Sequence, residues 1–381
     1  MAIKRRNFLK QLTSGVAASA VLVNDRLAAA PGGSEGERRG SGPRTLFLDR
    51  NENAYGPSSK VLAAVRAELG EINRFPAEAE SVLNEALTEF HHRRPEEFVV
   101  GGGSNAILQM AATVYLSPGK KVILGTPGYG ALENYARARG AQVEAVRLRK
   151  DHSHDLEAML AKADSSTGLI YICNPNNPTA TLTDRREIDG FLEKVPESVP
   201  VVVDEAYHEY AGSSGAYVSL IEKPVKARTG VIVLRTYSKA YALAGLRLGY
   251  AFSDPKTSAL LASARPRFAV SRLAAVAGVA ALLDRQHIAE CVRRNRDDRQ
   301  EFVNQVNGRM LRVLNPHANF ACLNTMGPAE EVLAHFRKHS VQLGPEIPSM
   351  PNYLRVSFGK PEEMQEFWRI WDLLKRHPMA M

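Results

Sequence analysis

Residues 231–250 read Val231-Ile-Val-Leu-Arg-Thr-Tyr-Ser-Lys-Ala-Tyr-Ala-Leu-Ala-Gly-Leu-Arg-Leu-Gly-Tyr250, and this stretch decides the fold. Its first four residues are apolar and predict a buried strand, which ends at Thr236, Ser238 and Lys239. Arg247 follows eight residues after the lysine. Hydroxyl groups and a guanidinium suit a phosphate, and an amine between them suits a covalent bond to a carbonyl carbon. A lone lysine is usually solvated, but one that follows an apolar strand among small residues is expected in a site.

Short apolar strands alternate with helical periodicity along most of the chain. The expected strands lie at residues 98–100, 121–124, 142–146, 168–173, 199–203 and 231–234. This alternation is typical of an α/β fold, a mainly parallel sheet with helices on both faces. After about residue 272 a long helix at 285–306 and strands at 319–323 and 353–357 predict a smaller α+β domain. We therefore expect an N-terminal arm at 44–74 that packs with the small domain, a large domain at 75–271 and a small domain at 272–381.

Polar residues also follow three other predicted strands. Gly101-Gly-Gly-Ser-Asn105 lies between a strand and a helix, where backbone N–H groups favour an anion, although three glycines are as often a plain flexible turn. Asn174-Pro-Asn-Asn-Pro-Thr-Ala180 has two Asn-Pro steps that fix an extended path and can aim an amide at a ligand, or form an ordinary turn. Asp204 ends an apolar strand at the edge where α/β folds bind ligands, or it caps a helix.

Composition excludes several classes of protein. The chain has 381 residues, of which 44% are hydrophobic and 24% charged, as in ordinary globular proteins. Half of the net charge of +8 lies in the first thirty residues, and the rest forms no single-sign run, so nucleic-acid binding is not indicated. The three cysteines are far apart and predict neither a disulfide framework nor a metal site. Beyond the N-terminus no apolar run is long enough to span a bilayer.

The first thirty residues have the order of a signal peptide. Lys4-Arg-Arg-Asn-Phe-Leu-Lys10 precedes a moderately apolar stretch and then Ala28-Ala-Ala30. Paired arginines before x-Phe-Leu-Lys resemble the twin-arginine signal, which exports folded proteins. We expect residues 1–30 to engage the twin-arginine export machinery, residues 31–43 to form a flexible linker, and the protein to be periplasmic, without stable membrane insertion after processing. A basic amphipathic surface helix is the alternative. Whether the segment is cleaved, and where, or is retained as an anchor stays open.

Several motifs occur in an order that resembles the aspartate-aminotransferase-like, fold-type I pyridoxal-phosphate (PLP) enzymes, and most closely the histidinol-phosphate aminotransferase family. The resemblance covers about residues 46–375. The motifs are Asn51-Glu-Asn-Ala-Tyr-Gly-Pro57, Gly101-Gly-Gly-Ser104, Pro127-Gly-Tyr129, Asn174-Pro-Asn-Asn-Pro-Thr179, Asp204-Glu-Ala-Tyr207, Ser238-Lys-Ala240, Ala244-Gly-Leu-Arg247 and Tyr353-Leu-Arg-Val-Ser357.

The resemblance implies a PLP cofactor and a role for each of these segments. Lys239 would form a Schiff base with PLP and then act as the catalytic base, while Asp204 would keep the pyridine nitrogen protonated. The ring hydroxyl would bind Asn177 and Tyr207, and Tyr129 would stack on the ring. The residues implied for the phosphate are Ser104, Asn105, Thr236, Ser238 and Arg247, together with Tyr55 from the partner of a homodimer. Arg355 would bind the substrate's anionic group.

Four departures from the family pattern bear on the substrate. Ala180 stands where glycine is usual, Asn105-Ala106 where Asp-Glu is frequent, and Gly128 where Thr or Ser is usual. Ser340-Val-Gln-Leu-Gly-Pro345 lacks the arginine that histidinol-phosphate enzymes carry to bind the substrate phosphate. We therefore expect an exported aminotransferase that acts on an amino acid and a 2-oxo acid. Histidinol-phosphate transamination, a β-lyase, racemase or decarboxylase reaction, and a non-catalytic sensor remain alternatives.

Overall fold

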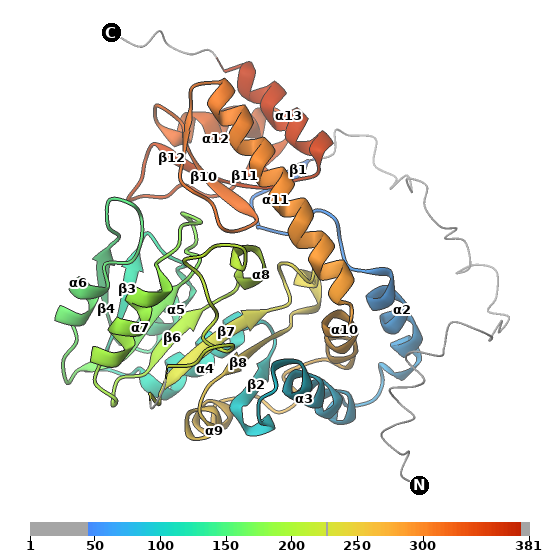
Figure 1. Ribbon diagram of the computed structural model, residues 1–381, viewed down its shortest axis with the longest axis vertical. Coiled ribbons are helices and arrows are strands. Elements are labelled where there is room, and N and C mark those ends of the chain that lie inside the picture. Colours follow the sequence, from blue (N-terminus) through green and yellow to red (C-terminus); the bar gives the residue numbers. More distant parts are fainter. Residues whose placement is uncertain (1–44, 226–227, 375–381) are drawn as a thin grey trace, which may run out of the picture. The chain divides into compact units, whose positions relative to one another are not determined.

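Seven strands form the main sheet of the computed structural model, which describes residues 45–225 and 228–374 (Figure 1). Four parallel pairings join neighbouring strands at one end of the sheet, and β8 runs antiparallel to both of its neighbours. In spatial order the strands are β2 (Phe98–Gly101), β8 (Gly249–Phe252), β7 (Val231–Thr236), β6 (Val201–Asp204), β5 (Thr167–Cys173), β3 (Lys121–Thr126) and β4 (Gln142–Arg147). The prediction of a mainly parallel sheet in an α/β fold is confirmed.

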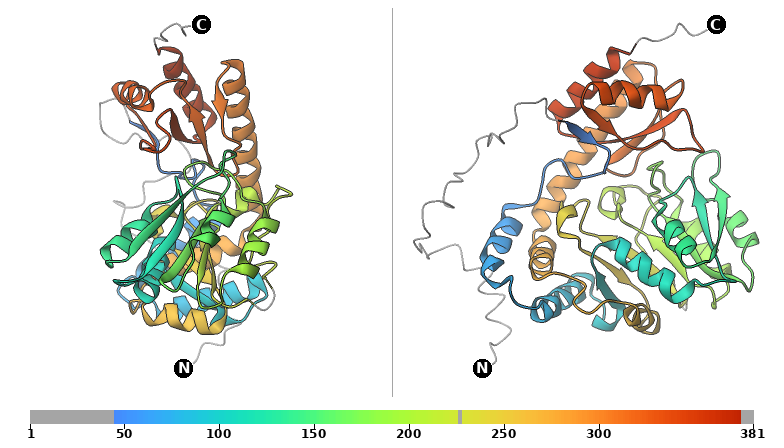
Figure 2. Two further views of the ribbon diagram at one scale, coloured as in Figure 1. Left: turned by 90° about the vertical axis from the view of Figure 1, so that its left-hand side faces the viewer. Right: turned by 180° about the vertical axis from the view of Figure 1, so that it is seen from behind.

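The central strands are apolar because helices cover both of their faces. Every residue of β5 is buried, as expected for a strand enclosed on two sides. Leu108, Leu132 and Leu261 belong to one hydrophobic core with one face of the sheet. These residues come from α4 (Ser104–Tyr115), α5 (Ala131–Ala138) and α9 (Pro255–Ser263). The view from behind in Figure 2 shows α4 in front of the sheet, and α7 (Arg185–Lys194) lies on the opposite face in Figure 1.

Two smaller sheets form a second core. β1 (Leu46–Leu48) pairs in parallel with β11 (Val341–Leu343), while β12 (Tyr353–Ser357), β10 (Phe320–Asn324) and β9 (Arg312–Val313) form an antiparallel sheet. Their side chains pack with α12 (Ala329–Lys338), α13 (Pro361–Asp372) and the end of α11 (Arg285–Gly308). Figure 1 shows α11 running from the main sheet's helices to these smaller sheets.

The N-terminal arm contacts both regions. β1 joins the smaller sheets, whereas α2 (Ser59–Glu68) packs on α10 (Arg272–Leu283), which also contacts α3 (Ala77–His91). The remaining short helices are α6 (Leu156–Ala161) and α8 (His208–Ala211). Residues 45–374 belong to one compact unit, so the predicted domain boundaries stay a prediction.

Two sequence-based expectations concern the membrane. Within residues 45–225 and 228–374 no helix is both long and apolar enough to cross a bilayer. The predicted signal peptide and linker lie outside the described residues, so twin-arginine export stays a prediction.

Candidate active site

All of the predicted site residues except Tyr55 meet in one cavity of about 500 Å³ at the carboxyl ends of β5, β6 and β7. Parallel strands end at the same edge, which brings together residues that lie far apart in sequence. The predicted residues that line this cavity are Ser104, Asn105, Tyr129, Asn177, Asp204, Tyr207, Thr236, Ser238, Lys239, Arg247 and Arg355.

Lys239 holds its amine inside this cavity. Its Nζ donates to the backbone oxygens of Asn51, at 2.9 Å, and of Arg50, at 3.2 Å. Burial, and after it the positive charge of Arg355, lower the pKa of Lys239 to about 8. An amine with a pKa near neutrality is able both to accept and to return a proton.

Asp204 ends β6 with its carboxylate buried. Tyr171 donates its hydroxyl to Oδ2 at 2.9 Å, and the N–H of Ala206 donates to Oδ1 at 3.0 Å. Burial raises the pKa of Asp204 to about 6, and these hydrogen bonds oppose the rise. A cationic group beside the carboxylate would lower this pKa and keep Asp204 ionised.

A network of amides and a guanidinium surrounds Tyr207. Asn177 and Asn51 each donate a side-chain N–H to the Tyr207 hydroxyl, at 3.2 and 3.1 Å. Arg355 donates Nη1 to Asn177 Oδ1 at 2.7 Å and Nη2 to the backbone oxygen of Asp49. Arg355 Nε is buried and has no hydrogen-bond partner among the described residues. The guanidinium is therefore held at the cavity with donor capacity left over.

An anion cradle lies where α4 begins. Gly103 precedes the helix with φ +87°, and a Cβ there would lie 2.4 Å from Arg247 Nη2. Arg247 Nη1 also lies 3.4 Å from Ser238 Oγ. The first-turn N–H groups of Ser104 and Asn105 have no acceptor within the helix. Helix N–H groups, a hydroxyl and an arginine together suit a phosphate.

The two remaining predicted tyrosines have different surroundings. Tyr129 lines the cavity, and its hydroxyl donates to Asn105 Oδ1 at 2.9 Å. The Tyr55 hydroxyl instead contacts Asp298 of the same chain, at 2.9 Å, and does not line the cavity. Its predicted reach to a partner's phosphate stays a prediction.

These contacts fit PLP. The buried Asp204 carboxylate, with its raised pKa, suits a protonated ring nitrogen, and the crowded Gly103–Arg247 cradle suits a phosphate. Lys239 lines the same cavity and suits the covalent bond to the aldehyde. The fold and this cavity define a PLP-dependent enzyme, and the chain belongs to the class I and II aminotransferase family, whose model matches residues 44–370.

Relatives of known name agree with this family. The chain is 37% identical to histidinol-phosphate aminotransferase 2 of Pseudomonas fluorescens, covering 84% of this chain and 86% of the relative. It is 35% identical to histidinol-phosphate aminotransferase 2 of Carboxydothermus hydrogenoformans, covering 84% and 88%. The histidinol-phosphate aminotransferase of Sinorhizobium meliloti, solved with pyridoxal 5′-phosphate, superposes with a TM-score of 0.81 at 25% identity, covering 87% and 92%. The predictions of a PLP cofactor and of an aminotransferase are confirmed.

Two residues that bond to the predicted site residues were missed from the sequence. Asn51 supplies an acceptor to Lys239 and a donor to Tyr207, and it has a positive φ of 54°. Its motif was noted, but nothing in the motif says that the arm folds back to the lysine. Tyr171 stands inside the apolar run of β5, where an aromatic residue is first interpreted as core.

The departures from the family pattern have local consequences. Ala180 has φ +61°, a conformation that glycine adopts without strain, and it is fully buried. Gly344 packs on Arg355: a Cβ there would lie 2.8 Å from the Arg355 backbone oxygen and 3.2 Å from its Nε. A side chain at Gly344 would therefore displace Arg355. Gly128 is similarly crowded, since its Cβ would lie 2.4 Å from the Gly125 backbone oxygen.

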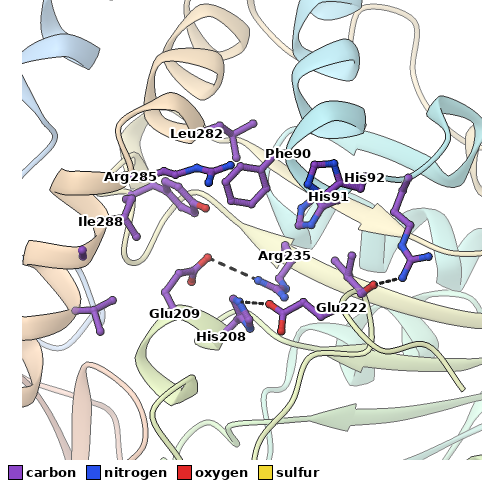
Figure 3. Close-up of a pocket in the computed structure, with 15 residues that line it drawn as sticks. Phe90, His91, His92, His208, Glu209, Glu222, Arg235, Leu282, Arg285 and Ile288 are labelled. Carbon is purple, nitrogen blue, oxygen red and sulfur yellow. Dashed lines mark hydrogen bonds and ion pairs between the residues drawn. The ribbon is translucent and has the colours of Figure 1, made fainter.

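A second cavity, of about 810 Å³, contains buried ionisable groups (Figure 3). Glu209 faces Arg235 at 3.8 Å, and His208 Nε2 lies 3.4 Å from Glu222 Oε1. Arg235 also donates to the buried Glu205 at 2.9 Å. Burial raises the pKa of Glu209 to about 7, although Arg235 opposes the rise.

Glu209→Gln is expected to stabilise the protein at high pH. The pKa of Glu209 is higher in the folded than in the unfolded state, so this group contributes stability that is fully present below the unfolded pKa of about 4.5. That stability is lost as pH rises through about 7, because the buried carboxyl must then ionise. The variant should gain about 1–3 kcal/mol at pH 8 and little at pH 5. Thermal unfolding at both pH values checks this, with the largely exposed Glu222→Gln as the control. An equal gain at both pH values would contradict the expectation.

Proposed function

We propose that the protein transfers an amino group between an amino acid and a 2-oxo acid, with the carboxylate of each bound by Arg355. The observation that carries this proposal is the placement of Lys239 and the guanidinium of Arg355 in one cavity. A planar guanidinium binds a carboxylate through two parallel hydrogen bonds. The buried Nε–H of Arg355 has no acceptor within residues 45–225 and 228–374, which supports such a role.

The residues divide the work of the reaction. Bound PLP supplies an electron sink for negative charge at the substrate's Cα. Lys239 Nζ would take the proton from Cα and place it on the C4′ carbon of the cofactor, and the reverse transfer would serve the 2-oxo acid. Asp204 would keep the proton on the ring nitrogen, while Asn177 and Tyr207 would donate hydrogen bonds to the ring hydroxyl. Tyr129 would cover the ring face, and the phosphate would be held by Ser104, Asn105, Thr236, Ser238 and Arg247.

A homodimer belongs to the same proposal, with Tyr55 reaching the partner's phosphate. The segment after α2 exposes large apolar side chains, with Phe75 75% and Ile72 64% exposed. Exposed apolar residues in one segment are typical of a surface that a partner covers. Light scattering should give the mass of two chains, and a monomer that retains full activity would rule the dimer out as a requirement.

Histidinol phosphate is the second candidate substrate. The names of the relatives favour it. Glycine, and not arginine, stands at position 344, which argues against histidinol phosphate. The phosphate ester would have no second cation beside Arg355 to bind it. The second candidate therefore predicts that Arg355 alone binds the phosphate.

The visible spectrum of the PLP-loaded enzyme separates the two candidates. We expect an amino acid to convert the cofactor to its pyridoxamine form, and histidinol phosphate to react at least about 100-fold more slowly. Arg355→Lys should raise the KM for the amino acid about 10–100-fold, because lysine cannot form the two parallel hydrogen bonds. Faster reaction of histidinol phosphate than of any amino acid would reverse the assignment.

We also propose that the protein is exported through the twin-arginine machinery to the periplasm. Arg5 and Arg6 before Phe8-Leu-Lys10 support this. Replacing both arginines with lysine should leave the enzyme in the cytoplasmic fraction, and unchanged fractionation would refute the route.

A further inference from the structure

A third cavity, of about 560 Å³, adjoins the active site. Tyr129, Asn177 and Arg355 line both cavities. A substrate whose carboxylate lies on Arg355 can therefore extend its side chain into this third cavity. The inference below rests on the proposed function and adds the chemical class of that side chain.

Apolar residues form part of the wall of the third cavity. Pro127, Pro178, Ile347 and Pro348 are among them. Such walls suit the methylene groups of a long side chain. The volume is that of a pocket for a small molecule, which leaves room for more than a methyl group.

More acidic than basic residues line the third cavity. Glu133 and Glu346 contribute two carboxylates, and Arg355 is the one cation among the lining residues, all of which are described. Glu133 lies in the first turn of α5 and accepts from Arg137 at 2.8 Å, but Arg137 does not line the cavity. Glu346 is exposed on the loop after β11. Once Arg355 binds the substrate carboxylate, the remaining formal charge of the lining is negative.

Gly344 keeps a second cation out of this region. Its Cβ would meet both the backbone and the Nε of Arg355, so a longer residue could enter only if Arg355 moved. A substrate with a distal phosphate or carboxylate would therefore face Glu133 and Glu346 without a compensating cation, which is unfavourable.

We propose that the amino donor has a long aliphatic side chain that ends in a cationic group, as in lysine, ornithine or arginine. Its methylene groups contact the proline and isoleucine walls, and its terminal charge lies near Glu133 and Glu346. This is the arrangement in which long cationic side chains cover apolar surface while the charged end stays solvated.

Two pairs of donors that differ in the end of the side chain test the proposal. The experiment measures how fast each amino acid consumes the PLP form of the purified enzyme. Lysine is compared with norleucine, and glutamine with glutamate. We expect lysine to react about tenfold faster than norleucine, and glutamate about tenfold more slowly than glutamine. The double variant Glu133→Gln, Glu346→Gln should bring both ratios near one. Glu366→Gln on α13, which also pairs with an arginine one turn away, should leave both ratios unchanged.

The outcomes separate this proposal from the proposed function. If no amino acid consumes the PLP form, both are overturned. If amino acids react but norleucine matches lysine, or glutamate reacts faster than lysine, only the cationic class is overturned. If histidinol phosphate reacts faster than every amino acid, both are overturned. Ratios that persist in the double variant overturn the assignment to Glu133 and Glu346.

Discussion

Lys239→Ala is expected to lower the rate of amino transfer by about 10³- to 10⁴-fold, the upper part of the range for loss of an acid–base group. The amine is the one basic group beside the reacting carbon in the proposed arrangement, and its pKa of about 8 suits it to both directions of proton transfer. The rate of conversion of the PLP form in a single turnover is the measurement.

The folding of the Lys239→Ala variant is checked independently. The anion cradle at Gly103 and Arg247 is intact in it, so PLP should still bind through its phosphate, and far-ultraviolet circular dichroism should be unchanged. Lys194→Ala on α7 is the matched control, since its side chain lies at the surface. A Lys239→Ala enzyme within tenfold of the wild type would exclude this residue as the base.

Asp204→Asn is expected to lower the same rate by about 10²- to 10³-fold, as when one preorganised electrostatic partner is removed. Asparagine is neutral, so it cannot stabilise a positive charge on the ring nitrogen. Tyr171→Phe removes one hydrogen bond to the same carboxylate and leaves its charge, so it should cost about tenfold or less. Single-turnover rates of the two variants give the comparison, and equal losses would show that the charge of Asp204 is not what matters.

The ends of the central strands were predictable because a run of apolar residues gives way there to polar ones. Lys239 and Asp204 each follow a buried apolar run, and parallel strands place such ends at one edge. Strand β8 was missing from the expected strands, and its antiparallel direction was not predictable because a short apolar strand carries no signal for its direction. The same reasoning missed Asn51, whose place depends on Ser357 and Asn319 rather than on its neighbours.

The substrate was the least predictable part. The sequence shows only that glycine, and not arginine, stands at position 344. The structure adds the reason that a larger residue is excluded, since its side chain would collide with Arg355. Glu133 and Glu346 had no signal of their own, because isolated glutamates are ordinary surface residues. They become informative only when the fold places both beside one cavity.

Asn51 has a consequence for synthesis of the protein in the cell. Its backbone N–H donates to Ser357 Oγ at 2.8 Å, and its backbone oxygen accepts from both Asn319, at 3.0 Å, and Lys239. A nascent chain that has already exposed Lys239 therefore lacks the contacts that position Asn51 until Ser357 has left the ribosome. The geometry in which Asn51 accepts from Lys239 can therefore form only after translation is nearly complete.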